Sequence, residues 1–98
     1  MIEVRQTATF LTWFKNLKDR KAKARIQARI DRMELGNFGD VAPVGEGVSE
    51  LRIHYGPGYR VYFVQLDLVV VILLSGGDKS SQDTDIKKAK EFAKQLED

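Results

Sequence analysis

Three side chains that could bind and activate a phosphate ester lie close together in residues 51–63, LRIHYGPGYRVYF. Residues 56–58, Gly-Pro-Gly, are typical of the loop of a β-hairpin. Strand alternation around this loop places Arg52, His54 and Arg60 on one face of the hairpin. Arginine binds phosphate through paired hydrogen bonds, and histidine carries protons near neutral pH. The hairpin therefore predicts a phosphate site with a titratable base.

The predicted register pairs His54 with Arg60 and Arg52 with Tyr62, and alternation also puts Glu50 on this face. Like charges that oppose each other across a sheet destabilise it unless an anion lies between them. This favours a phosphate ligand. The alternative is a solvated face that carries whichever polar residues alternation allows. Tyr62 is then either a side chain that stacks on a base or a cover for the sheet.

Lys79 follows a glycine pair in residues 75–82, SGGDKSSQ. A glycine-rich exit from a strand can bring backbone N–H groups and a lysine up to an anion. The spacing is not that of a P-loop, and a simple turn is the alternative interpretation.

A basic stripe is predicted on one face of a helical hairpin, since residues 1–35 hold nine Lys or Arg against four Asp or Glu. Such a stripe is either a solvated helix face or a contact for a nucleic-acid backbone or an acidic partner. Its members recur at helical spacing: Lys18, Lys21, Arg25, Arg29 and Arg32.

The composition limits the classes of function. The chain has 98 residues and a net charge of +2, with no cysteine and one histidine, which excludes a disulfide framework and argues against a zinc site. No segment has the roughly 18 apolar residues that span a bilayer, and the N-terminus has no apolar signal core. We expect one domain, residues 1–98, in the cytoplasm, with no membrane partner.

Periodicity and caps predict an α+β fold in the order β-α-α-β-β-β-α, a helical hairpin packed on a small, mainly antiparallel sheet. Thr7 or Thr9 is expected to cap the first helix, Asp19 the second, and Asp83 or Asp85 the last. Gly76-Gly77 is expected to end the last strand. The expected strands are 2–6, 48–55, 59–66 and 68–74, and 37–47 is expected to be a loop.

Together these residues resemble the RelE/ParE superfamily of bacterial toxins, and in particular its HigB-like "addiction module killer" branch. The similarity is sharpest at ELRIHYGPGYRVYF, residues 50–63, and at LLSGGDKSSQDTDIKKAKEFA, residues 73–93. The resemblance implies a RelE-like fold and the toxin of a type II toxin–antitoxin module. Its activity would be that of an endoribonuclease that enters the ribosomal A site and cleaves mRNA by attack of a ribose 2′-hydroxyl on the adjacent phosphate.

The resemblance also implies roles for particular residues. Arg52 and His54 match two site lysines of the strand before the turn, Arg60 matches the arginine after it, and Lys79 matches an arginine that follows the last strand. His54 would be the general base, the other three would stabilise charge on the phosphate, and no metal or other cofactor would be needed. The basic stripe and Tyr62 would contact RNA or the ribosome.

The implied partner is a cognate antitoxin, a small helix-turn-helix repressor through which the complex would bind operator DNA. The chain departs from the family pattern in one respect, because it has no Tyr or His after Tyr62, where RelE-like toxins commonly carry one. Two alternatives therefore stay open. One is a ParE-like toxin that inhibits DNA gyrase without cleaving RNA, and the other is a chain with weak activity that serves mainly as a partner for its regulator.

Overall fold

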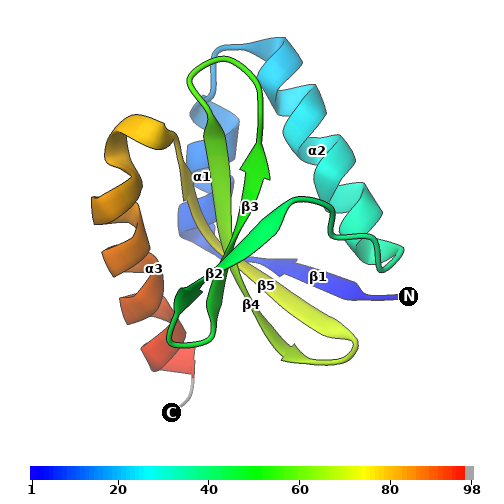
Figure 1. Ribbon diagram of the computed structural model, residues 1–98. Coiled ribbons are helices and arrows are strands. Elements are labelled where there is room, and N and C mark those ends of the chain that lie inside the picture. The colour runs from blue at the N-terminus through cyan, green and yellow to red at the C-terminus, as the bar shows by residue number, and fades with distance from the viewer. Residues whose placement is uncertain (97–98) are drawn as a thin grey trace.

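The computed structural model describes residues 1–96, in which a five-stranded sheet has helices on both faces (Figure 1). A short 3₁₀ turn, Lys79–Ser81, leads into the last helix. The elements follow in the order β1 (Glu3–Gln6), α1 (Ala8–Asn16), α2 (Arg20–Glu34), β2 (Val41–Gly45), β3 (Val48–Ile53), β4 (Tyr59–Asp67), β5 (Val70–Gly77) and α3 (Gln82–Leu96).

The sheet order is β1-β5-β4-β3-β2. The first strand, β1, lies parallel to β5, while all other neighbours are antiparallel. The predicted α+β class and the mainly antiparallel sheet are confirmed.

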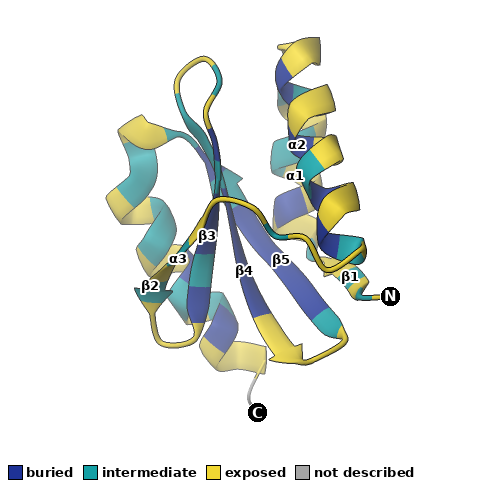
Figure 2. Ribbon diagram, turned by 45° about the vertical axis from the view of Figure 1, so that its right-hand side comes forward, coloured by how far each residue is buried: buried dark blue, intermediate teal, exposed yellow. Residues whose placement is uncertain are grey.

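Helices α1 and α2 cover one face of the sheet, as predicted (Figure 2). Thr7 caps α1 by accepting a hydrogen bond from the Phe10 N–H, and Asp19 caps α2 by accepting from Lys21 and Ala22. The apolar sides of the two helices pack on the inward residues of the strands. This core includes Phe10, Ile26, Ile30, Met33, Leu51, Ile53, Val61, Phe63, Val71 and Leu73.

Helix α3 covers the opposite face of the sheet (Figure 2). Its buried Ala89 and Ala93 pack in a second core with Val48, Tyr62, Val64, Ile72 and Leu74. The predicted caps of this helix are wrong, because α3 begins at Gln82, before Asp83 and Asp85. Asp78 instead caps the preceding 3₁₀ turn by accepting from the Ser80 N–H.

Strand β2 lies in residues 37–47, which the sequence predicted to be a loop. The strand is at the edge of the sheet, where a proline such as Pro43 is tolerated because only one side of the strand is paired. Glu46 and Gly47 both have positive φ, 55° and 80°, as expected for the two-residue turn that joins β2 to β3.

The glycine pair does not end β5, which continues through Gly77. A Cβ on Gly76 would lie 2.3 Å from the Trp13 ring of α1, and a Cβ on Gly77 would lie 1.8 Å from Oδ2 of Asp85 on α3. The two glycines therefore let a helix approach each face of the sheet. They bring α1 and α3 close to the end of the sheet that carries the β3–β4 hairpin.

Among residues 1–96, no helix is long and apolar enough to cross a membrane.

Candidate active site

The loop of the β3–β4 hairpin runs from His54 to Gly58, which is longer than predicted. Arg52 therefore lies opposite Arg60, and the predicted pairs His54–Arg60 and Arg52–Tyr62 are wrong. The cause is local hydrogen bonding in the loop. The Tyr55 N–H donates to the Ile53 carbonyl at 2.9 Å and the Gly58 N–H to the Tyr55 carbonyl at 3.1 Å.

An open hollow of about 410 Å³ lies beside this loop. Its charged lining consists of His54, Arg60 and Lys79, three of the four residues predicted to be catalytic, and loop residues 55–58 complete it. A Cβ on Gly58 would lie 3.6 Å from Cβ of Lys79, so the loop packs against the 3₁₀ turn that carries this lysine. His54 is open to solvent, with 76% of its side chain exposed.

Arg52, the fourth predicted residue, does not line this hollow. Its Nε donates to Oε1 of Glu50 at 2.8 Å, and Oε2 of the same carboxylate is 3.5 Å from Nε of Arg60. The hydrogen bond from Arg52 to Glu50 is the main cause that raises the pKa of Arg52. Glu50 thus supplies the negative charge that the facing arginines require. Only 1% of this residue is exposed, so the charge is part of the protein interior.

Asp40, which precedes β2, was not among the predicted site residues. Its Oδ2 is hydrogen-bonded to Nε2 of His54, and this bond is the main cause that lowers the pKa of Asp40. The Asp40 carbonyl also accepts from the Arg52 N–H at 3.0 Å, so β3 fixes the backbone position of Asp40. No local pattern in the sequence indicates a contact between residues 40 and 54.

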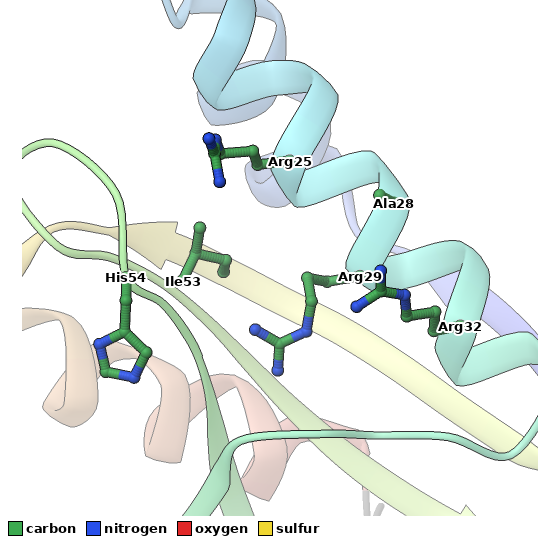
Figure 3. Close-up of a pocket in the computed structure, with 6 residues that line it drawn as sticks. All are labelled: Arg25, Ala28, Arg29, Arg32, Ile53 and His54. Carbon is green, nitrogen blue, oxygen red and sulfur yellow. The ribbon is translucent and has the colours of Figure 1, made fainter.

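A second hollow, of about 240 Å³, lies between α2 and the hairpin (Figure 3). Arg25, Arg29 and Arg32 lie on successive turns of α2 and face His54 and Ile53 (Figure 3). His54 lines both hollows. The predicted basic stripe therefore leads from α2 to the histidine at the first hollow.

Not all of the basic stripe is free to bind a ligand. Arg29 donates from Nη1 to the Arg52 carbonyl at 2.6 Å and from Nη2 to the Phe38 carbonyl at 3.1 Å. Burial is the main cause that lowers its pKa. Arg29 thus ties α2 to β3. The exposed members of the stripe are Lys18, Lys21, Arg25 and Arg32.

Arg25 is held in place by an aromatic ring of the hairpin loop. Its guanidinium lies over the ring of Tyr55, 4.7 Å from the centroid. The Tyr55 hydroxyl in turn donates to Oδ2 of Asp19, the cap of α2, at 3.0 Å. Arg25, which lines the second hollow, is therefore linked through Tyr55 to the start of α2.

Tyr62 was predicted to contact RNA, but it has no exposed surface and lies in the core beneath α3. It does share a face with Arg60, as alternation predicts, and that face is covered by a helix. Burial is the main cause that raises the pKa of Tyr62. In this arrangement Tyr62 contributes packing and cannot stack on a base.

Within residues 1–96, no group of three or more His, Cys, Asp or Glu side chains is placed to hold a metal ion. The arrangement offers a different kind of chemistry. An exposed imidazole with an acidic partner stands next to a guanidinium and an ammonium group, and this set can remove a proton and stabilise charge on a phosphate.

Comparison with known proteins places the chain in a family. Residues 12–97 match the family described as "Phage derived protein Gp49-like (DUF891)". A protein of Haemophilus influenzae, described only as uncharacterized, is 54% identical over 95 residues, which cover 97% of this chain and 96% of the relative. No solved structure matches significantly. The chain therefore belongs to the phage-derived Gp49-like family, a RelE/HigB-type, toxin-like family.

Proposed function

We propose that the protein is the toxin of a type II toxin–antitoxin module and acts as a metal-independent mRNA endoribonuclease in the ribosomal A site. Membership of a toxin-like family implies a cognate antitoxin. The observation that carries the proposal is that His54, Arg60 and Lys79 line one open hollow. These are three of the residues that the resemblance to RelE-like toxins implies.

The proposed reaction begins at Nδ1 of His54. A carboxylate only accepts hydrogen bonds, so Nε2 keeps its proton and donates a hydrogen bond to Asp40, and Nδ1 is left as the basic nitrogen. Nδ1 takes the proton of the ribose 2′-hydroxyl, and O2′ forms a bond to the adjacent phosphorus. The bond from phosphorus to O5′ breaks, and O5′ takes a proton from water. The products are a 2′,3′-cyclic phosphate and a 5′-hydroxyl.

Arg60 and Lys79 have the second role, which is to stabilise negative charge on the pentavalent phosphate and on its leaving oxygen. Arg60 is suited to this because it lines the hollow and its guanidinium is always charged and forms strong hydrogen bonds to phosphate. The exposed cationic side chains in and near the second hollow would bind backbone phosphates of ribosomal RNA or of the mRNA. These are Lys18, Lys21, Arg25 and Arg32.

The partner would be a small helix-turn-helix repressor that binds the toxin and carries the complex to operator DNA. This toxin would contribute no contacts of its own to the operator. Binding of the antitoxin over the hairpin loop would cover His54 and so block cleavage.

In vitro translation with mapping of mRNA 5′ ends tests the function. The parent protein should produce cuts positioned by codon in translated messages. His54→Ala should reduce cleavage about 10²- to 10⁴-fold, while Arg5→Ala, an exposed substitution on the edge strand β1, should have no effect. Intact messages together with damaged DNA in cells that express the parent protein would instead identify a gyrase inhibitor.

A further inference from the structure

Glu50 is an unusual residue because it is an ionisable side chain in the interior of the protein that is only 1% exposed. It lies on β3 and faces α3, on the same side of the sheet as Arg52, Arg60 and Tyr62. A carboxylate in such a place is costly unless cations and hydrogen-bond donors surround it. Its low exposure also means that it does not touch a substrate in the hollow.

Three side chains from two separate parts of the chain, the β3–β4 hairpin and the start of α3, surround this carboxylate. Nε of Arg52 is 2.8 Å from Oε1, and Nε of Arg60 is 3.5 Å from Oε2. The side-chain amide of Gln82 donates to Oε2 at 3.2 Å and approaches Oε1 at 3.5 Å. Gln82 is the first residue of α3 and follows the 3₁₀ turn that presents Lys79 to the hollow. Glu50 therefore links the hairpin motif to the Gly-Gly-Asp-Lys-Ser motif.

The two arginines use this carboxylate differently. Arg52 is joined to it by a hydrogen bond of normal length, whereas Arg60 has only the longer ion pair. Among residues 1–96, Nε and Nη1 of Arg60 are buried without any hydrogen-bond partner. The negative charge of Glu50 thus attracts the Arg60 guanidinium without accepting a hydrogen bond from it.

We propose that Glu50 is a positioning residue, a buried carboxylate that is anchored by Gln82 and that orients Arg60 toward the hollow. The inference rests on the endoribonuclease function proposed above, and it adds the requirement that Gln82, at the start of α3, holds Glu50 for the site to be formed. Without the carboxylate, two guanidiniums on adjacent strands would repel each other. Arg60 would then turn away from the position in which it meets the phosphate.

The first test compares Glu50→Gln with Ala93→Gly on programmed ribosomes. Glu50→Gln keeps the shape of the side chain and removes its charge. Because a displacement of about 1 Å can cost 10²-fold in rate, its maximal cleavage rate should fall by about that factor. Ala93→Gly removes a buried methyl group near the opposite end of α3 from Gln82, so it should lower the Tm while the contact between Gln82 and Glu50, and with it the cleavage rate, is kept. Equal loss of rate in both variants would overturn the proposal.

The pH profile separates positioning from proton transfer. If Glu50 only orients Arg60, the acid limb of the profile should keep its midpoint in Glu50→Gln, although every rate is lower. Loss of that limb would show that Glu50 itself takes the proton, which would overturn the assignment.

A charge exchange separates geometry from simple neutralisation. The double variant Glu50→Gln with Gln82→Glu keeps the net charge and moves the carboxylate from β3 to the first residue of α3. We expect the Tm to recover toward that of the parent while the cleavage rate stays low, because Arg60 then meets the charge from the wrong direction. Recovery of both quantities would overturn the proposal.

An NMR measurement does not depend on cleavage at all. The Nε–Hε group of Arg60, which is buried, should be protected from exchange in the parent and in Ala93→Gly, and should lose protection in Glu50→Gln because Arg60 turns away. If these signals behave as expected but the parent cleaves no RNA, the proposed function fails and the positioning role of Glu50 stands. Unchanged protection in a folded Glu50→Gln variant would overturn that role.

Discussion

Nε2 of His54 is hydrogen-bonded to Oδ2 of Asp40, across the gap between the hairpin loop and the start of β2. The histidine is in the loop and has no strand pairing to hold it. Its orientation therefore depends on Asp40, whose own backbone is held by β3 and by Arg29. This hydrogen bond engages Nε2 and leaves Nδ1 as the other imidazole nitrogen.

Replacement of Asp40 should weaken cleavage through this relationship. Asp40→Ala should reduce the rate by up to about 10²-fold, as a misplaced catalytic group does, and by less than His54→Ala. Single-turnover cleavage of ribosome-bound mRNA measures both. In His54→Ala, the further change Asp40→Ala should have little effect, because the two residues act as one unit. Additive losses would contradict a shared role.

The facing arginines should differ in their effects. Arg60→Ala removes a donor from the hollow and should reduce the cleavage rate about 10²- to 10³-fold. Arg52→Ala removes a partner of the buried Glu50 and should also lower the Tm, since part of a buried ion pair is broken. Thermal unfolding measured beside cleavage separates the two effects. A larger loss of rate in Arg52→Ala than in Arg60→Ala would contradict our assignment.

The second hollow predicts two classes of arginine on α2. Arg25→Ala with Arg32→Ala should weaken ribosome binding and reduce its dependence on salt, because fewer phosphate contacts form, while the Tm is little changed. Arg29→Ala should instead destabilise the protein, since it leaves the carbonyls of Arg52 and Phe38 without their donors. The expected loss is about 1–2 kcal/mol, kept small by the partial exposure of this guanidinium.

The glycine pair predicts a contrast in stability. Gly76→Ala should destabilise the protein by about 1–3 kcal/mol, because the new Cβ would lie 2.3 Å from the rigid ring of Trp13. Gly77→Ala should cost less, since Asp85 can rotate away, although it then loses its hydrogen bond from Ser81. Denaturant unfolding measures both changes. Equal costs would show that the Trp13 ring also moves freely.

Lowered carboxylate pKa values predict how stability depends on pH. Hydrogen bonds from His54 to Asp40 and from Ser80 to Asp78 hold these pKa values below the ordinary value of 3.8. Their contribution to stability is therefore complete above 3.8 and is lost as the pH falls through the lower native values. The Tm should be steady above about pH 5 and fall in acid. Asp40→Asn should make that acid loss smaller.

Most of the fold could be predicted because its signals are local. Thr7 and Asp19 are caps followed by apolar residues at helical spacing, and residues 59–66 alternate as a strand does. Strand β2 could not be found in this way. Its glycines and Pro43 are typical of a loop, and only its place at the edge of the sheet makes them acceptable in a strand.

The sequence indicated the positively charged residues of the site, but not the contacts that its acidic residues make. Alternation correctly put Arg52 and Arg60 on one face. The motif at Lys79 could also be read as a simple turn, and it was the resemblance that put Lys79 in the site, where it lines the hollow with Arg60. The contacts made by Glu50 and Asp40 join segments that are far apart in the sequence, so no spacing rule finds them. Alternation also placed Tyr62 correctly, but it could not say that α3 would cover that face.

The pairing of β1 with β5 has a consequence for how this chain is made. The first strand leaves the ribosome early but has no strand partner until β5 has followed it, so the sheet cannot close before β5 is made. The amide that anchors Glu50 emerges later still, at Gln82. Contacts between distant segments also slow folding. A growing chain therefore acquires its reactive surface only after β5 and Gln82 have been made.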